Sequence, residues 1–256
     1  MPLVRRDQYL ILSSLAALVT LAWVYLLVIN LNLPDMPTMA PGIHPWTSTD
    51  FVMMFLMWAI MMFAMMVPSA MRTVLIYARI AARAEVQDSL VTSTFVFVFG
   101  YIVIWTLFSV MVTALQWAME TAALLSPMMV TTSSSLGAAL LLAAGIYQLT
   151  PLKDVCLRHC QSPLMFMVTH YQKGMFGAFQ LGLKHGAYCL GCCWLLMGLL
   201  FVGGVMNLIW ILAISVFVLA EKLLPAKIRS TRITSIIMIL AGSVYLVESY
   251  TAHHLF

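Results

Sequence analysis

The stretch Met53–Met71 reads MMFLMWAIMMFAMMVPSAM and places eight methionines within 19 residues. With its flanking residues, this stretch is long and apolar enough to cross a lipid bilayer as a helix. On a helix, methionines spaced four residues apart fall on one side, so the stretch carries a face of thioether sulfur. The positions on or beside this side, called the methionine face below, are Met53, Met57, Met61, Met62, Met65 and Met66. Thioethers are soft ligands that suit Cu(I), and the competing interpretation is packing by a flexible apolar side chain.

The rest of the composition also indicates a membrane protein. Of the 256 residues, 63% are hydrophobic and 9% are charged, and the mean hydropathy is +1.00. These values exclude a soluble globular domain and predict an all-α, polytopic membrane helix bundle, with residues 1–256 forming a single integral membrane domain. The first apolar run is expected to be a retained helix rather than a cleaved signal peptide. The seven predicted spans are roughly 9–31, 50–77, 91–117, 134–150, 183–204, 206–222 and 233–250.

The positive charges orient these spans. All 13 Lys and Arg residues fall on one side, and the segments assigned to the other side (32–49, 118–133 and 251–256) contain none. The positive-inside rule then places the N-terminus in the cytoplasm and the C-terminus outside. The rule also accounts for the net charge of +4, so this charge does not indicate a nucleic-acid partner.

Two groups of cysteines are the strongest candidate site. Their five members are Cys156, Cys160, Cys189, Cys192 and Cys193. Within each group the spacing is three or four residues, which brings the thiols to one face of a helix. His159 and His185 lie beside the two groups. The expected cytoplasmic side is reducing, which favours free thiols or metal thiolates over disulfides. A soft-metal site, redox-active thiols and inert packing are all open interpretations. Two or three thiolates suit Cu(I), while four would suit zinc or an iron–sulfur cluster, which we consider less consistent with the chain.

The segment that precedes the methionine face contains further soft ligands. Met36, Met39 and His44 lie in a proline-rich stretch without a cation. They could capture copper at the outer mouth of the bundle, or they could be incidental residues of a proline-rich turn.

A long apolar segment separates the fourth and fifth predicted spans. A structureless loop of more than 30 residues is uncommon in a compact protein, so we expect an interfacial or re-entrant helix within 151–182. Gly182 and Gly186 are four residues apart and could allow two helices to approach closely.

Three motifs resemble those of a bacterial family of predicted metal-binding integral membrane proteins, a domain of unknown function. They are the stretches from Met61 to Ser69, from Tyr147 to Pro163, and from Gly186 to Trp194. The likeness extends roughly from Trp46 to Tyr250. It implies a metal, without specifying which, and a bacterial inner membrane as the location.

The function that these observations favour is copper handling, either uptake or delivery, with the lipid bilayer and a metal ion as partners. The same chemistry would serve an accessory subunit or assembly factor of a membrane metalloenzyme, which would add other membrane subunits as partners. A thiol–quinone oxidoreductase is a further alternative. The sequence contains no persuasive hydrolytic constellation, so a binding or transport protein is favoured over an enzyme.

Overall fold

The computed structural model describes residues 5–32, 46–83, 90–125, 129–131, 133–224 and 230–254. Apart from an isolated bridge between Leu125 and Thr131, the regular structure of these residues is helical. The helices are α1 (Arg5–Asn32), α2 (Ser48–Arg83), α3 (Leu90–Thr121), α4 (Ser134–Gln148), α5 (Pro151–Gln161), α6 (Pro163–His170), α7 (Gly174–Gly198), α8 (Leu200–Gly203), α9 (Leu208–Leu223) and α10 (Ser230–His254). The expected all-α helix bundle is therefore confirmed.

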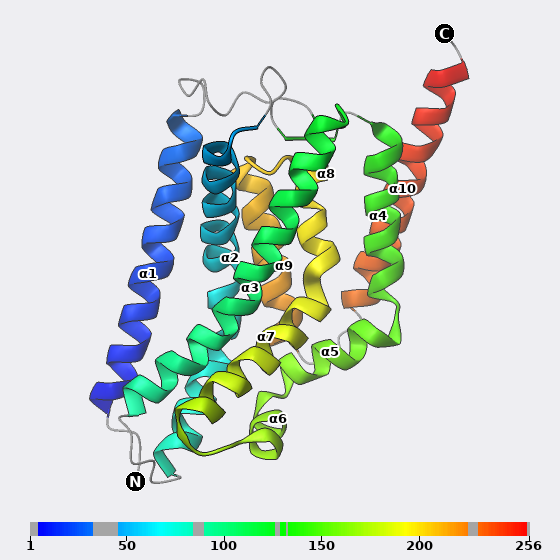
Figure 1. Ribbon diagram of the computed structural model, residues 1–256. Coiled ribbons are helices and arrows are strands. Elements are labelled where there is room, and N and C mark those ends of the chain that lie inside the picture. Colours follow the sequence, from blue (N-terminus) through cyan, green and yellow to red (C-terminus); the bar gives the residue numbers. More distant parts are fainter. Residues whose placement is uncertain are drawn as a thin grey trace.

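Five helical segments are long and apolar enough to cross a membrane. They are Arg6–Asn32, Ser48–Ala82, Leu90–Thr121, Gly174–Gly203 and Thr231–Glu248. A sixth candidate is the bent pair of α4 and α5, whose axes differ by 66°. The span expected at 206–222 corresponds to α9, which has 16 residues. The count of seven and the orientation thus stay predictions. Figure 1 shows α1 beginning at one end of the bundle and α10 finishing at the other.

The methionine-rich helix α2 begins at a capping arrangement. The Thr47 backbone N–H donates to the Asp50 carboxylate at 2.8 Å, and the Asp50 N–H donates back to the Thr47 hydroxyl at 3.3 Å. These reciprocal bonds satisfy N–H groups that the first turn of a helix leaves unpaired. Pro68 lies inside α2, and the helix continues beyond it to Arg83. The methionine face therefore belongs to one continuous helix.

Glycines allow α3 and α7 to pack in close contact. A Cβ atom added to Gly182 would lie 3.2 Å from the Gly100 Cα, and one added to Gly186 would lie 2.9 Å from a side-chain carbon of Ile104. Such separations leave no room for a larger residue at either glycine. The close approach expected at Gly182 and Gly186 is confirmed, and it fixes the position of the cysteines on α7 relative to Tyr101 on α3.

The expected helical structure within 151–182 consists of α5, α6 and the beginning of α7. Helix α7 begins at Gly174, nine residues before the boundary expected at 183. Helix α5 begins at Pro151, a favoured first helical residue, and the Thr150 hydroxyl caps it by accepting from the Lys153 N–H at 3.4 Å. Because α5 packs against α7, the two groups of cysteines face each other.

Candidate metal centre

The five cysteines form one buried group, called the thiol cluster below. All five are free thiols, and none is more than 8% exposed. Cys156 and Cys160 come from α5, whereas Cys189, Cys192 and Cys193 come from α7. The structure thus brings together two groups that lie about 30 residues apart in the sequence.

Cys189 is at the centre of the thiol cluster. Its thiol is within hydrogen-bonding range of the thiols of Cys160, Cys192 and Cys193. The thiols of Cys192 and Cys193 both donate to the Cys189 carbonyl oxygen at 3.0 Å. Cys156 lies close enough to Cys192 to interact with it electrostatically. These contacts bring thiols of α5 and α7 together around Cys189.

Glycine at position 191 is what lets Cys156 approach α7. A Cβ atom at Gly191 would lie 2.8 Å from the Cys156 sulfur, which is well inside ordinary van der Waals contact. The carbonyl of Gly191 also accepts a hydrogen bond from the Tyr147 hydroxyl, which ties the end of α4 to the same turn of α7. Helices α4, α5 and α7 therefore pack together at the thiol cluster.

Two polar side chains contact the Cys189 sulfur from other helices. The Lys222 Nζ donates to this sulfur at 2.8 Å and to the Ser69 hydroxyl at 2.9 Å. The Tyr101 hydroxyl lies 3.1 Å from the same sulfur and donates to the Met66 carbonyl oxygen at 3.1 Å. Lys222 and Tyr101 are both buried. A buried ammonium beside a thiol is suited to balance the negative charge of a thiolate.

A second buried lysine close by already has its counter-charge. Lys153 forms an ion pair with Glu221 at 2.8 Å and also donates to the Gln148 side-chain oxygen. Glu221 is the neighbour of Lys222 in the sequence, yet its carboxylate is directed to Lys153. The carboxylate of Glu221 is thus engaged elsewhere, and Lys222 contacts the Cys189 thiol and the Ser69 hydroxyl instead.

From Met57 onward, the methionine face points into the protein. Met57, Met61, Met62, Met65 and Met66 are at most 1% exposed. They belong to the same continuous cluster of buried side chains as the five cysteines. At the level of Met66 and Ser69, α2 reaches the thiol cluster through Tyr101 and Lys222. Thioethers and thiols therefore form one connected interior rather than two separate patches.

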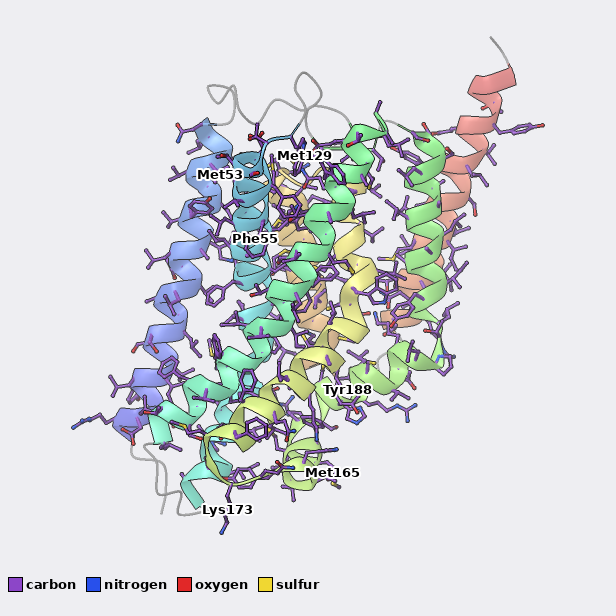
Figure 2. The ribbon with its side chains drawn as sticks, in the orientation of Figure 1. Met53, Phe55, Met129, Met165, Lys173 and Tyr188 are labelled. Atoms are coloured by element: carbon purple, nitrogen blue, oxygen red, sulfur yellow. The ribbon has the colours of Figure 1, made fainter. Side chains whose placement is uncertain are left out.

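The remaining sequence candidates lie in different places. Met53 lies near the start of α2, where Figure 2 labels it, and it is 47% exposed. It therefore does not share the interior with the other five methionines. His159 stacks on Tyr188 with ring centroids 4.1 Å apart, and its Nδ1 is bonded to the Val155 carbonyl. His185 is buried near Cys189. Met36, Met39 and His44 lie outside the described residues.

Within the described ranges, no group of three or more His, Cys, Asp or Glu side chains is arranged to hold a metal ion. The thiols instead bond to backbone and to neighbouring side chains. Sequence reasoning did not find Tyr101, Ser69 or Lys222. Lys222 was used only to orient the chain, and nothing in its sequence neighbourhood shows that its side chain turns inward.

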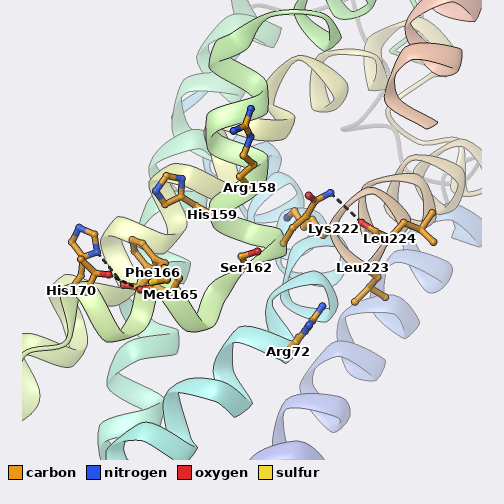
Figure 3. Close-up of a pocket in the computed structure, with 12 residues that line it drawn as sticks. Arg72, Arg158, His159, Ser162, Met165, Phe166, His170, Lys222, Leu223 and Leu224 are labelled. Atoms are coloured by element: carbon orange, nitrogen blue, oxygen red, sulfur yellow. Dashed lines mark hydrogen bonds between the residues drawn. The ribbon is translucent and has the colours of Figure 1, made fainter. Parts of the chain in front are cut away.

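A cavity of about 840 Å³ opens beside the thiol cluster. Figure 3 shows Arg72, Arg158 and Lys222 on its wall, together with the histidines at positions 159 and 170. Lys222 thus lines this cavity and also contacts the Cys189 sulfur. Its side chain connects the surface of the bundle with the buried thiols.

A family model described as copper chaperone (PpoB2) matches residues 55–245, which begin within α2 and end within α10. The chain belongs to this copper chaperone family. The match confirms the metal-related family expected from the three motifs and associates the chain with copper. No curated protein and no solved structure is significantly similar to the chain. The methionine face from Met57 onward and the whole thiol cluster lie within the residues that the copper chaperone family covers.

Proposed function

We propose that the chain is a multi-pass protein of the bacterial inner membrane that takes up Cu(I) along the methionine face from Met57 onward and delivers it to the thiol cluster. The observation that carries the proposal is that five buried thioethers of α2 and five buried thiols of α5 and α7 lie in one cluster of buried side chains. Copper handling by the family supports it.

The distribution of donors favours one direction. Thioethers are neutral ligands, whereas thiols become anionic thiolates when they bind a metal. An ion of charge +1 in an apolar interior is more stable where negative charge is present. The thiol cluster is therefore the lower-energy position, and copper is expected to move from the outer end of α2 toward Cys189.

The exposed surface supports a position within a bilayer. Large apolar side chains are exposed on several of the helices, an arrangement that would be an aggregation hazard in water. Examples with more than half of their surface exposed are Leu21, Leu31, Phe99, Leu107, Ile209, Val216, Ile237 and Val247. Figure 2 places Lys173 at the end of the bundle opposite Met53 and Met129, as the proposed cytoplasmic side requires.

The sulfur donors also favour copper over the other metals considered. Zinc and iron–sulfur clusters use thiolates but have little affinity for thioethers, so they would leave the methionine face without a role. Cu(I) accepts both kinds of sulfur. The purified protein is thus expected to take up Cu(I) and to retain it in the presence of excess zinc.

The test is a Cu(I)-binding measurement on the purified protein in lipid nanodiscs without oxygen, with a coloured Cu(I) chelator as competitor. Cys189→Ser combined with Cys192→Ser should abolish the tightest copper equivalent. Met62→Leu should weaken the thioether equivalents, whereas Met53→Leu, which changes an exposed methionine of the same helix, should bind as the unchanged protein does. A protein that competes for no copper at all would refute the proposal.

A second candidate function is the loading of a membrane copper enzyme. The observation that favours it is the family's description as copper chaperone, since a chaperone hands its metal to another protein. The cavity beside Lys222 offers a place where a recipient could approach the thiol cluster. Co-purification of a stoichiometric partner, dependent on the cysteines, would favour loading over uptake.

A further inference from the structure

A second sulfur-containing site lies at the other end of the bundle, around Gln116 of α3. Gln116 is fully buried. The Trp58 indole N–H donates to its side-chain oxygen at 2.6 Å, which fixes which end of the amide is oxygen and which is nitrogen. The amide nitrogen therefore faces Glu120 on the next turn of α3, Met54 of α2 and Met129 of the segment that follows α3.

That nitrogen faces more acceptors than it has protons. Its neighbours are a Glu120 carboxylate oxygen at 2.8 Å, the Met129 sulfur at 3.4 Å and the Met54 sulfur at 3.8 Å. A side-chain amide carries two N–H bonds, so one of the three acceptors is always left without a proton. The surplus electron pairs belong to two soft thioethers and one carboxylate, which together match a soft cation of charge +1.

Met129 is held in this position at a conformational cost. Its φ angle is +54°, a left-handed backbone that residues other than glycine adopt rarely, and its side chain is 1% exposed. The backbone thus takes an unfavourable conformation while the thioether is buried against Gln116. Figure 2 shows Met129 at the same end of the bundle as Met53, the end where α2 begins.

We propose that Met54, Met129 and Glu120 form a copper-capture site that loads Cu(I) onto the methionine face. The site rests on the proposed function, and it differs from the thiol cluster in its donors. The two thioethers and one Glu120 oxygen bind the ion, and the charge of the carboxylate balances that of the ion. The other Glu120 oxygen accepts from the Trp46 indole N–H at 2.7 Å, which holds the carboxylate in place. Met57, one helical turn beyond Met54 and buried, receives the ion next.

The experiment uses the full chain with Cys189→Ser and Cys192→Ser, so that tight binding by the thiols does not mask the capture site. Cu(I) is titrated in nanodiscs without oxygen, and X-ray absorption identifies the ligands of the bound ion. Copper bound by sulfur together with an oxygen ligand is expected. Adding Met129→Leu should lower the affinity for this copper ion at least tenfold, and adding Glu120→Gln should remove the oxygen ligand from the spectrum.

Met53→Leu in the same background is the control, because it changes a methionine at the same end of α2 that is 47% exposed. Thermal unfolding of each variant shows whether it has folded. A variant that fails to fold is replaced by the single Met129→Leu change in the cysteine-containing protein, where only the weaker copper equivalent should be affected. The capture site is overturned if Met129→Leu and Glu120→Gln bind copper as Met53→Leu does. Failure of the proposed function gives a different result: in that case the protein with all its cysteines shows no copper binding that depends on the thiols.

Discussion

Replacing Lys222 with methionine tests whether a buried ammonium sets the copper affinity of the thiol cluster. Methionine keeps most of the length and the apolar stem of lysine but removes the charge and the donors to Cys189 and Ser69. A hydrogen bond to a charged group contributes about 1.5–3 kcal/mol. If this contribution is lost only when Cys189 is a copper-bound thiolate, Cu(I) affinity should fall by about 10- to 100-fold, since each 1.4 kcal/mol corresponds to a factor of about ten.

The assay is Cu(I) competition in nanodiscs, with Lys184→Met as the matched control. Lys184 lies on α7, the helix that carries three of the thiols, but it is exposed. Both variants lower the net charge by one, so a difference between them reflects position rather than overall charge. Lys222→Arg should retain part of the affinity because the charge is kept while the fit beside Ser69 changes. Equal affinities for Lys222→Met and Lys184→Met, with both proteins folded, would refute the reasoning.

Three further perturbations test the packing and the chemistry. Gly182→Ala should lower the free energy of unfolding by about 1–3 kcal/mol, because the added Cβ would press on α3. Gly198→Ala is the control and should change this free energy little, since its Cβ would have its nearest neighbour at 4.0 Å. Denaturant unfolding monitored by circular dichroism measures both. Lys153→Met should destabilise the protein by about 3–5 kcal/mol because it leaves Glu221 buried without its partner, and combining it with Glu221→Leu should restore part of the loss in the same assay. Lowering the pH should weaken copper binding to the thiols, which must release protons to bind, and should leave thioether binding unchanged; a competition titration that shows equal pH dependence for both would contradict this.

Local sequence patterns predicted most of the helices, because the formation of a helix depends mainly on residues close together in the sequence. The methionine face follows from four-residue spacing, and the capping residues at Thr47 and Thr150 explain where two helices begin. The start of α7 was placed too late, at 183, whereas the helix begins at Gly174. The nine additional residues include Gly177 and Gly182, which lie in close contact with neighbouring backbone. Apolar spacing along the chain does not show such contacts.

The candidate site was only partly predictable, for a physical reason. Spacing along one helix shows that Cys189, Cys192 and Cys193 share a face, but it does not show which residues of other helices meet that face. Tyr101 and Lys222 reach Cys189 from α3 and α9, over separations of 88 and 33 residues. Such contacts depend on how whole helices pack. Met53 shows the same limit, since spacing places it on the methionine face while its position at the end of α2 leaves it exposed.

Charge determines where copper would stop along the proposed route. On the methionine face, the ligands are neutral and the ion keeps its full charge of +1 in an apolar interior. Each position there is therefore expected to bind copper only weakly and transiently. Two thiolates that share the ion leave a net charge of −1, and the Lys222 ammonium brings the total to zero. Because Lys222 also lines the cavity at the surface, a recipient that displaces its ammonium from Cys189 would remove that balance and weaken the hold on copper. On the proposed route, release would then be coupled to the approach of a recipient, and without Lys222 the thiol cluster should hold copper less tightly.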